Sequence, residues 1–129
     1  MTGNKEENRS NQQLGAHGEY LAVSFLERKG YRTVDRNYRC KGGEVDIIAC
    51  DGNTLVFVEV KTRRSLSFGV PQLAVTPFKQ RQIMKAALTW LSHHQNHDTP
   101  ARFDVIAITL QSDADPFIEH LENAFELDY

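Results

Sequence analysis

The tripeptide Asp51-Gly52-Asn53 joins two runs of β-branched and aromatic residues, and it constrains the fold of this chain more than any other feature. The runs, residues 44–50 and 54–62, have the composition of β-strands. Gly and Asn tolerate the positive φ that a two-residue hairpin loop requires. The sequence therefore predicts an antiparallel β-hairpin that turns at residues 52–53.

This hairpin determines which side chains share a face of the sheet. A loop at residues 52–53 places Asp46 opposite Glu59 and Glu44 opposite Lys61. A loop one residue earlier shifts the register, but these side chains still share one face of the sheet, because side chains alternate along a strand. All four charged residues are therefore expected on one face. The other face is expected to be apolar and to pack on the core; it comprises Val45, Ile47, Ala49, Val56, Val58 and Val60.

Two opposed carboxylates in a sheet require an explanation. Directly paired residues have Cβ atoms about 4.5–5.5 Å apart, so Asp46 and Glu59 would repel each other and lose hydration. A divalent cation removes this repulsion, and carboxylate oxygens that stay partly open to water suit Mg²⁺ or Mn²⁺. Lys61 projects to the same side, where an ammonium group can stabilise developing negative charge or orient a water molecule.

A further carboxylate comes from the first predicted helix, residues 13–29. Glu19 lies within the apolar arc of this helix, so it is expected to point inward with the core residues. An inward helix carboxylate beside the strand charges favours a functional site. A structural interpretation stays open, in which the strand lysine pairs with Glu44 or Glu59 and Asp46 caps a turn.

The remaining segments complete an α/β domain. Residues 1–12 are polar and without a period, which predicts a disordered tail before a single domain over residues 13–129. Thr76 and Pro77 are typical of a helix N-cap and first helical position, so a second helix begins there. The element order α-β-β-β-α-β-β predicts a central mixed sheet flanked by helices: helix 13–29, strands 31–38, 44–50 and 54–62, helix 76–93, and strands 102–110 and 117–121.

Charge is distributed unevenly around a formal net charge of -2. Residues 28–85 carry twelve Lys or Arg against five Asp or Glu, whereas residues 113–129 carry six acids and no Lys or Arg. A small net charge can therefore hide a basic face for nucleic acid, although a solvated basic surface with an acidic tail explains the same pattern. The candidates for phosphate contacts are Arg36, Arg39, Lys41, Arg63, Arg64, Lys79 and Arg81.

Other features argue against several classes of function. No apolar run is long enough to span a bilayer, and the N-terminus lacks the apolar segment of a secretory signal, so a cytoplasmic protein without a membrane partner is expected. His93, His94 and His97 follow a predicted helix end in a polar stretch, where cationic His is favourable without a metal, so a zinc site is not expected. Cys40 and Cys50 lack zinc-ligand spacing and are expected to be reduced thiols.

Three further side chains are interpreted as structural. Phe78 and Trp90 on the second helix are expected in the core rather than at a base-stacking surface. Asp104 alternates into the partly buried side of its strand and is expected to pair with Arg102 or with a helix.

At the charged hairpin the chain resembles the PD-(D/E)XK nuclease superfamily, whose core is a helix, a β-hairpin with Asp and then Glu-x-Lys, a second helix and further strands. Asp46 matches the motif aspartate, Glu59-Val60-Lys61 matches Glu-x-Lys, and Glu19 matches the first-helix glutamate of several branches. The chain departs from the pattern because Val45, rather than proline, precedes the aspartate, as in many members. The resemblance implies a restriction-endonuclease-like fold.

Nearly the whole chain is similar to the YraN-type family of small bacterial proteins, which is related by fold to archaeal Holliday-junction resolvases. The motifs that carry this similarity are specific only together, and they support the fold more firmly than the reaction. They are Gly15-Ala16-His17-Gly18-Glu19, Asn37-Tyr38-Arg39, Gly43-Glu44-Val45-Asp46-Ile47-Ile48, Val56-Phe57-Val58-Glu59-Val60-Lys61-Thr62-Arg63, Arg102-Phe103-Asp104-Val105 and Asn123-Ala124-Phe125.

The resemblance implies a metal-dependent nuclease that hydrolyses phosphodiester bonds in DNA, including branched or otherwise structured DNA, to a 5′-phosphate and a 3′-hydroxyl. Lys61 would then help to position the attacking water, and Glu44 would either support the metal ligands from behind or pair with Lys61. Gln80 lies on the inward side of the second predicted helix and could support the ligands as well, but a structural role near the helix start is slightly favoured. The implied ligands of Mg²⁺ or Mn²⁺ are Asp46, Glu59, the Val60 carbonyl and Glu19.

Two further expectations concern partners. Because related resolvases cut two strands symmetrically, the analogy also points to a homodimer. The alternative function is that of a non-catalytic nucleic-acid-binding or assembly protein that retains the nuclease fold. A metal response and DNA cleavage would separate these two functions.

Overall fold

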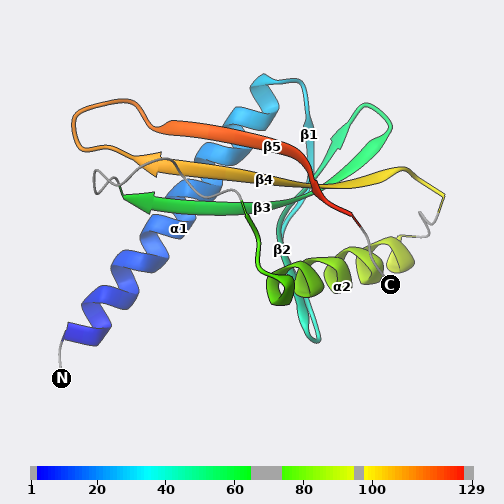
Figure 1. Cartoon of the computed structure of the whole chain (residues 1–129), viewed down its shortest axis with the longest axis horizontal. Helices are drawn as coiled ribbons and strands as arrows, with labels where there is room; N and C mark the ends of the chain where they lie inside the picture. Colours follow the sequence, from blue (N-terminus) through cyan, green and yellow to red (C-terminus); the bar gives the residue numbers. More distant parts are fainter. Residues whose placement is uncertain (1–2, 65–73, 95–97, 127–129) are drawn as a thin grey trace.

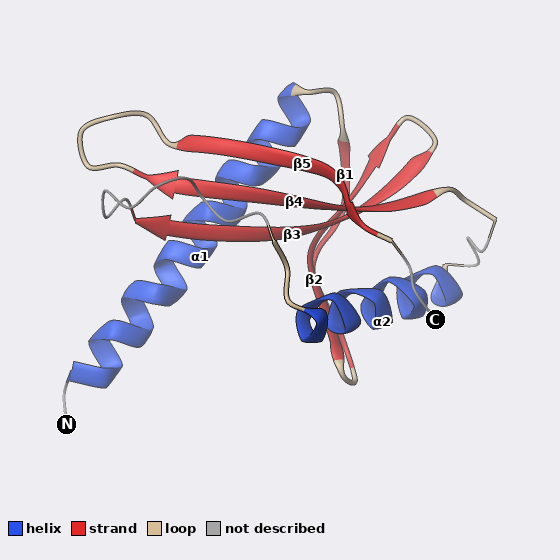
Figure 2. Ribbon diagram, viewed as in Figure 1, coloured by secondary structure: helices blue, strands red, loops and turns tan. Residues whose placement is uncertain are grey.

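The structure, a computed structural model, describes residues 3–64, 74–94 and 98–126. Two helices lie against one five-stranded sheet (Figures 1 and 2). No helix in the described ranges is both long and apolar enough to cross a membrane. In chain order the elements are α1 (Gly3–Arg28), β1 (Arg32–Cys40), β2 (Gly43–Asp51), β3 (Thr54–Arg64), α2 (Pro77–His93), β4 (Ala101–Leu110) and β5 (Phe117–Phe125).

The sheet is mixed, and its strands follow chain order from β1 to β5. β3 and β4 are parallel, whereas every other neighbouring pair is antiparallel. A parallel pair requires a crossover connection, and α2 lies within the connection between β3 and β4. The prediction of an α/β domain with helices on a mixed sheet is therefore confirmed.

Each helix covers a separate apolar core on one face of the sheet. Under α1, Leu26 packs in one cluster with Val58 of β3. Under α2, Trp90 packs in the other cluster with Phe57 of β3, and the two rings meet edge to face with centroids 6.2 Å apart. Consecutive residues of β3 thus enter different cores, as the pleat of a strand requires.

The predicted hairpin register is confirmed where β2 and β3 pair. Asp51 lies opposite Thr54, and Ile47 lies opposite Val58. Gly52 adopts a positive φ of 60° in the turn, which is the conformation that a two-residue loop requires. The turn residues therefore set the register of the central hairpin.

The two helix starts differ in how well the sequence predicted them. α2 begins at Pro77, and the side-chain oxygen of Thr76 caps it as predicted by accepting from the N–H of Lys79 at 3.2 Å. α1 begins at Gly3 rather than at residue 13, where the sequence predicted the start of the first helix. The Glu, Lys, Gln and Arg in this segment extend a helix readily once its first turn exists.

The prediction that both aromatic side chains of α2 are buried is confirmed for Trp90 but not for Phe78. Trp90 is buried as expected, but Phe78 is 63% exposed and therefore does not belong to the core. Phe78 lies in the first turn, off the side that carries the buried residues of the helix. His94 stacks on the Trp90 ring with centroids 3.9 Å apart, which gives it a packing role, and His97 lies outside the described residues.

β1 and β2 change their facing together at Asn37 and Asp46. The residues on either side pair regularly, but Asn37 has a positive φ of 52°. Val45 consequently packs in the core under α2, whereas Ile47 packs in the core under α1. The predicted apolar face is corrected at Val45, because strict alternation takes no account of a local irregularity in two adjacent strands.

Candidate metal centre between two strands

β2 and β3 separate beyond Ile47 and Val58, the last residues of the two strands that pair. We call this opening the fork; Figure 1 shows β2 leaving β3 there and running toward α2. Asp46 stands at the fork, where its Oδ2 accepts a hydrogen bond from the N–H of Val60 at 2.8 Å. The carboxylate thus satisfies a backbone donor that has lost its partner strand.

α1 brings Glu19 to the fork. Its close approach depends on Gly18, because a Cβ there would lie 1.8 Å from Thr62 Oγ1. Burial, and then the adjacent charge of Asp46, raise the pKa of Glu19 above its ordinary value, and the two carboxyl groups are hydrogen-bonded. On the other side, the Asn37 amide, oriented to donate, lies 2.6 and 3.2 Å from the two Glu19 oxygens.

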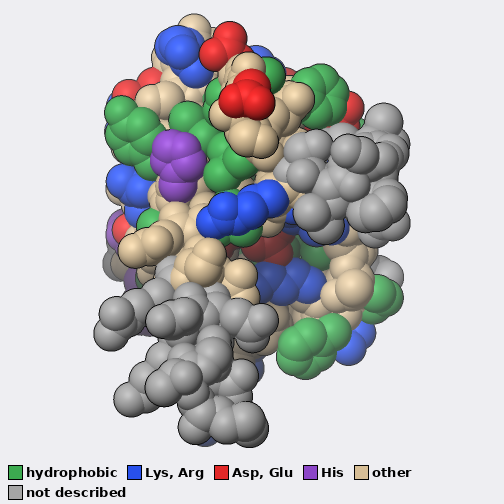
Figure 3. Space-filling view, turned by 90° about the vertical axis from the view of Figure 1, so that its left-hand side faces the viewer, with side chains coloured by type: hydrophobic (Ala, Val, Ile, Leu, Met, Phe, Trp, Pro, Cys, Tyr) green, Lys and Arg blue, Asp and Glu red, His purple; other side chains and the backbone are tan. Residues whose placement is uncertain are grey.

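A hollow of about 340 Å³ opens between α1 and the fork. Figure 3 views the molecule from the end where β3 finishes and shows acidic atoms recessed between Lys and Arg side chains. The hollow is acidic, because Glu19 and Asp46 are its charged lining residues in the described part of the chain. The described residues that line it are Asn11, Leu14, Gly15, Glu19, Asp46, Val60 and Thr62.

Glu59 lies on the α2 side of the fork and is 6% exposed. Lys79 of α2 places its Nζ 2.6 Å from Glu44 Oε1 and 3.7 Å from Glu59 Oε2. The hydrogen bond from Lys79 lowers the pKa of Glu44. Burial, and then the contact with Asp46, raise the pKa of Glu59 to about 9. Glu59 therefore holds a proton at neutral pH in the absence of a metal ion, although the Lys79 ammonium group is nearby.

The four strand charges do not share one face, so this prediction is wrong in part. Glu44 and Glu59 meet at Lys79 under α2, whereas Asp46 lines the hollow under α1. The irregularity in β2 turns Asp46 out of simple alternation. Asp46 and Glu59 still meet through the opening of the fork, where they are hydrogen-bonded.

The side chain of Lys61 is not directed toward Glu44 or Glu59, as the structural interpretation would require. Its Nζ donates to the backbone carbonyl of Ala74, shortly before α2. Among the described residues, no ion pair joins Lys61 to a carboxylate of the fork. The alternative in which Lys61 pairs with Glu44 or Glu59 is therefore not what the structure shows, and Lys79 makes these contacts instead.

Gln80 does not reach the fork. Its Nε2 donates to the Val75 carbonyl at 2.8 Å, at the start of its own helix. Gln80 therefore has the structural role near the helix start that was the favoured interpretation, rather than a role behind the metal ligands. Glu44 does reach the fork, through its bond to Lys79.

The structure distributes the predicted basic residues around the fork. Arg39 Nε lies 3.7 Å from Glu44 Oε2, and the charge of Arg36 acts on Glu19. Lys41 and Arg81 are exposed, on the β1–β2 turn and on α2 respectively. Farther along β3, Arg63 Nε donates to Thr109 Oγ1 at 3.4 Å and Arg64 donates to Ser10 Oγ at 3.2 Å.

The donor set suits a hard divalent cation. In the described ranges no three His, Cys, Asp or Glu side chains are grouped to hold an ion as they stand, and Asp46 contacts Glu19 and Glu59 as two separate pairs. The fit rests on charge, because both neighbours of Asp46 have raised pKa values that a cation would lower. The residues therefore fit Mg²⁺ or Mn²⁺ with Asp46 as the shared ligand, once Glu59 releases its proton.

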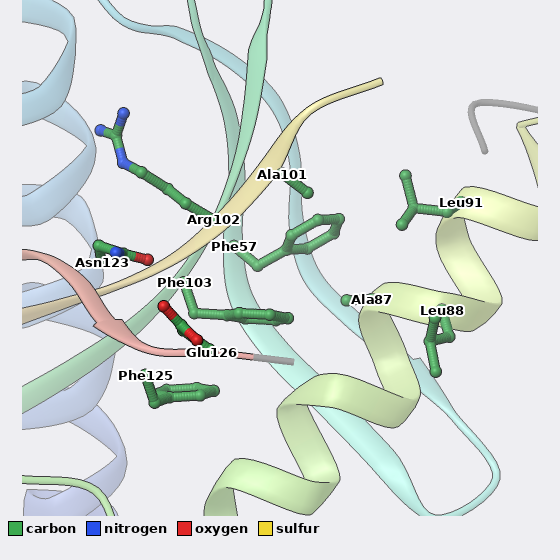
Figure 4. Close-up of a pocket in the computed structure, with 10 residues that line it drawn as sticks. All are labelled: Phe57, Ala87, Leu88, Leu91, Ala101, Arg102, Phe103, Asn123, Phe125 and Glu126. Carbon is green, nitrogen blue, oxygen red and sulfur yellow. The ribbon is translucent and has the colours of Figure 1, made fainter. Parts of the chain in front are cut away.

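A second hollow, of about 290 Å³, lies between α2 and the face of the sheet that α2 covers (Figure 4). Phe57, Phe103 and Phe125 line it, and the last two rings stack with centroids 4.8 Å apart. Figure 4 shows Arg102 directed away from it. This apolar hollow lacks the carboxylates of the fork and is not part of the candidate centre.

Sequence reasoning did not assign a role to Asn37 and assigned Lys79 a different one. The positive φ of Asn37 is a conformation that Asn adopts more readily than most residues, and its amide holds Glu19. Asn is rare inside strands, so Asn37 between strand-forming residues was a usable signal of a break. Lys79 was predicted to contact phosphate, yet it lies against the carboxylates.

Comparison with known proteins gives one consistent relationship. The sequence profile of the uncharacterised protein family UPF0102 matches residues 18–108. A UPF0102 protein of Geobacter sulfurreducens is 66% identical over 119 residues, which cover 92% of this chain and 93% of the relative. A UPF0102 protein of Rhodococcus opacus is 51% identical over 112 residues, which cover 87% of this chain and 95% of the relative. The matched range contains Glu19, Asp46 and Glu59.

Proposed function

Because the chain belongs to the uncharacterised protein family UPF0102, whose name states no activity, we propose its function from the fork itself. The chain is a metal-dependent nuclease of restriction-endonuclease-like fold that hydrolyses phosphodiester bonds in DNA. One observation carries this proposal: Asp46 lies between two carboxyl groups whose pKa values are raised. Arg36 near Glu19 and Lys79 near Glu59 do not bring these pKa values back to their ordinary range, whereas a purely structural cluster would neutralise its charges fully.

The fork provides oxygen ligands from two strands and a helix. Asp46, Glu59 and the Val60 carbonyl would hold Mg²⁺ or Mn²⁺, with Glu19 bound directly or through water. Such a cation supplies a water of lowered pKa and polarises a phosphodiester oxygen. Glu59 must lose its proton before it can bind, so we expect activity to rise from neutral to alkaline pH.

The two lysines have distinct roles in this proposal. Lys79 remains cationic beside Glu59. Burial lowers its pKa, but the hydrogen bond of Glu44 and the negative charges around the ammonium group together raise the pKa above its ordinary value. Its ammonium group is placed to stabilise negative charge on a phosphate oxygen. Lys61, once released from the Ala74 carbonyl, orients the attacking water. By analogy with the PD-(D/E)XK superfamily, the products are a 5′-phosphate and a 3′-hydroxyl.

Basic side chains around the fork would hold the DNA backbone. Arg36 and Arg39 lie beside Glu19 and Glu44, close to the carboxylates that would bind the metal. Contacts of this kind neutralise phosphates without reading the base sequence. The substrate is therefore expected to be selected by its shape, as branched or otherwise structured DNA, rather than by its sequence.

Cleavage assays test this proposal. Linear and branched DNA are incubated with Mn²⁺ and with wild type, Asp46→Asn, Lys61→Ala or the exposed control Asp113→Asn. We expect wild type and the control to cut equally, and the other two variants to lose about 10²-fold or more of the rate, the effect of removing one group that acts on the transition state. Equal traces of cutting by wild type and Lys61→Ala would indicate a contaminant and overturn the proposal.

A non-catalytic DNA-binding protein with the same fold is the second candidate. The hydrogen bond of Lys61 to the Ala74 carbonyl favours it, because that bond keeps the lysine from the carboxylates. This candidate predicts DNA binding without cutting, and binding that Lys61→Ala leaves unchanged.

A further inference from the structure

α2 presents an exposed row of side chains, whose last member, Leu88, also borders the apolar hollow of Figure 4. Phe78, Arg81, Lys85 and Leu88 are all exposed and recur at the three- and four-residue spacing of one helix face. Phe78 is the most exposed large hydrophobic side chain among the described residues, at 63%. We call these four residues the outward row of α2.

The outward row is strongly basic. α2 contains no Asp or Glu between Pro77 and His93. The β1–β2 turn lies alongside, because a Cβ at Gly42 would come within 3.6 Å of Lys85 Nζ. The exposed Lys41 precedes Gly42 in this turn and adds a further cation to the same region. An anionic partner is therefore favoured over a neutral or basic one.

The outward row ends at the fork. Phe78 directly precedes Lys79, whose Nζ contacts Glu44 and Glu59. The exposed aromatic residue is thus the sequence neighbour of the lysine that contacts the carboxylates, and Arg81 and Lys85 follow it along the helix. Proteins that bind single strands combine these two elements, a basic path for the phosphates and an aromatic ring on which bases stack.

We propose that the outward row of α2 binds a single strand of DNA and that an unpaired base stacks on Phe78. This inference rests on the proposed function and names its substrate class: DNA with a single-stranded arm at a branch, rather than continuous duplex. The faces of paired bases are covered by their neighbours in a duplex, so Phe78 can stack only on an unpaired base. Arg81 and Lys85 neutralise the phosphates that follow.

Binding measured without catalysis tests the inference. Fluorescein-labelled single-stranded, duplex and branched oligonucleotides are titrated in EDTA, so that no cutting occurs. The variants are Phe78→Ala and the matched control Leu88→Ala, which shortens another exposed apolar side chain of the same row. We expect Phe78→Ala to weaken binding of single-stranded and branched DNA by roughly five- to a hundredfold, the effect of losing one base stack. Leu88→Ala and duplex binding should remain unchanged.

Other outcomes overturn the inference. If Phe78→Ala binds DNA as tightly as wild type, no base stacks on Phe78. If the protein binds duplex more tightly than single strands, DNA with a single-stranded arm is not its substrate class. Equal loss in Phe78→Ala and Leu88→Ala without any DNA preference overturns the stacking of a base on Phe78, because the loss is then not specific to the aromatic ring. Selective loss in Phe78→Ala together with no cutting in Mn²⁺ keeps the inference and overturns only the proposed nuclease function.

Discussion

Two carboxyl groups buried in the same sheet, Asp104 and Glu59, behave in opposite ways. Asp104 is 0% exposed and Glu59 is 6% exposed, so burial raises the pKa of both groups. The pKa of Asp104 nevertheless lies below its ordinary value, whereas that of Glu59 lies far above it. The difference therefore comes from the neighbours of each group.

Asp104 is surrounded by donors, in a cluster that we call the Asp104 network. Its Oδ1 accepts from Arg102 Nε and from the N–H of Asn123, both at 3.0 Å. Its Oδ2 lies 2.8 Å from His120 Nε2. These hydrogen bonds together outweigh burial and lower its pKa. The prediction that Asp104 pairs with Arg102 is thus confirmed, and the network joins β4 to β5.

Glu59 has the opposite surroundings. Its neighbours include the acids Asp46 and Glu44, and the ammonium of Lys79 lies 3.7 Å away while bonding more closely to Glu44. The same sheet therefore gives Asp104 enough hydrogen-bond donors to stay ionised. At the fork it instead brings several carboxyl groups close together, so that Glu59 is favoured in its protonated form. Perturbed groups that stability does not require are candidates for function.

The largest expected effect on stability comes from a substitution that breaks the Asp104 network. Asp104→Ala leaves Arg102 and His120 without their buried partner, so we expect the free energy of unfolding to fall by about 3–5 kcal/mol. Urea unfolding at neutral pH measures the change. The exposed Asp113→Ala serves as the control and should lie within about 0.5 kcal/mol of wild type. A similar small loss in both variants would show that the network does not stabilise the sheet.

The next effect concerns the approach of α1 to the fork. A Cβ at Gly18 would lie 1.8 Å from Thr62 Oγ1, whereas a Cβ at Gly15 meets nothing within 4 Å. Gly18→Ala should therefore destabilise the protein by about 1–3 kcal/mol, while Gly15→Ala should stabilise it by about 0.5–1 kcal/mol through helix propensity. Thermal unfolding compares the matched pair. Equal effects would mean that α1 does not need this close contact.

The third expected effect is a difference in pH dependence between wild type and Glu59→Gln. Above pH 4.5, the ordinary pKa of Glu59, the unfolded chain has lost a proton that the folded chain keeps until about pH 9. Stability should therefore fall with rising pH across this window, and Glu59→Gln should abolish the fall. We expect wild type to lose at least about 1 kcal/mol relative to Glu59→Gln between pH 6 and pH 8. Parallel stability curves would contradict the raised pKa.

Asp104 should make stability change with pH in the opposite direction, because its pKa in the folded protein is lowered. Its contribution is present above its ordinary pKa of 3.8 and is lost as pH falls through the lower folded value. The two buried carboxyl groups thus predict losses of stability at opposite ends of the pH range.

The central hairpin and the start of α2 could be predicted because short-range chemistry determines them. Gly52 sets the turn, and Thr76 with Pro77 sets the cap. Local sequence was sufficient there because each feature depends on a few adjacent residues.

The geometry of the fork could not be predicted in the same way. The change of facing at Asn37 and Asp46 requires two strands to deform together, and alternation along one strand gives no sign of it. The exposure of Phe78 depends on which side of α2 the sheet covers. The contact of Lys79 with Glu44 and Glu59 depends on where α2 docks, which is long-range information.

Titration calorimetry with Mn²⁺ at pH 8 tests the central claim most directly. Wild type should bind Mn²⁺ with release of a proton from Glu59, visible as a heat that depends on the buffer, and saturation to 100 times Kd should stabilise the fold by about 2.7 kcal/mol. Asp46→Asn should abolish both effects, whereas Asp113→Asn should retain them. Binding of Mn²⁺ by Asp46→Asn as tightly as by wild type, or no proton release, would contradict a metal centre at the fork.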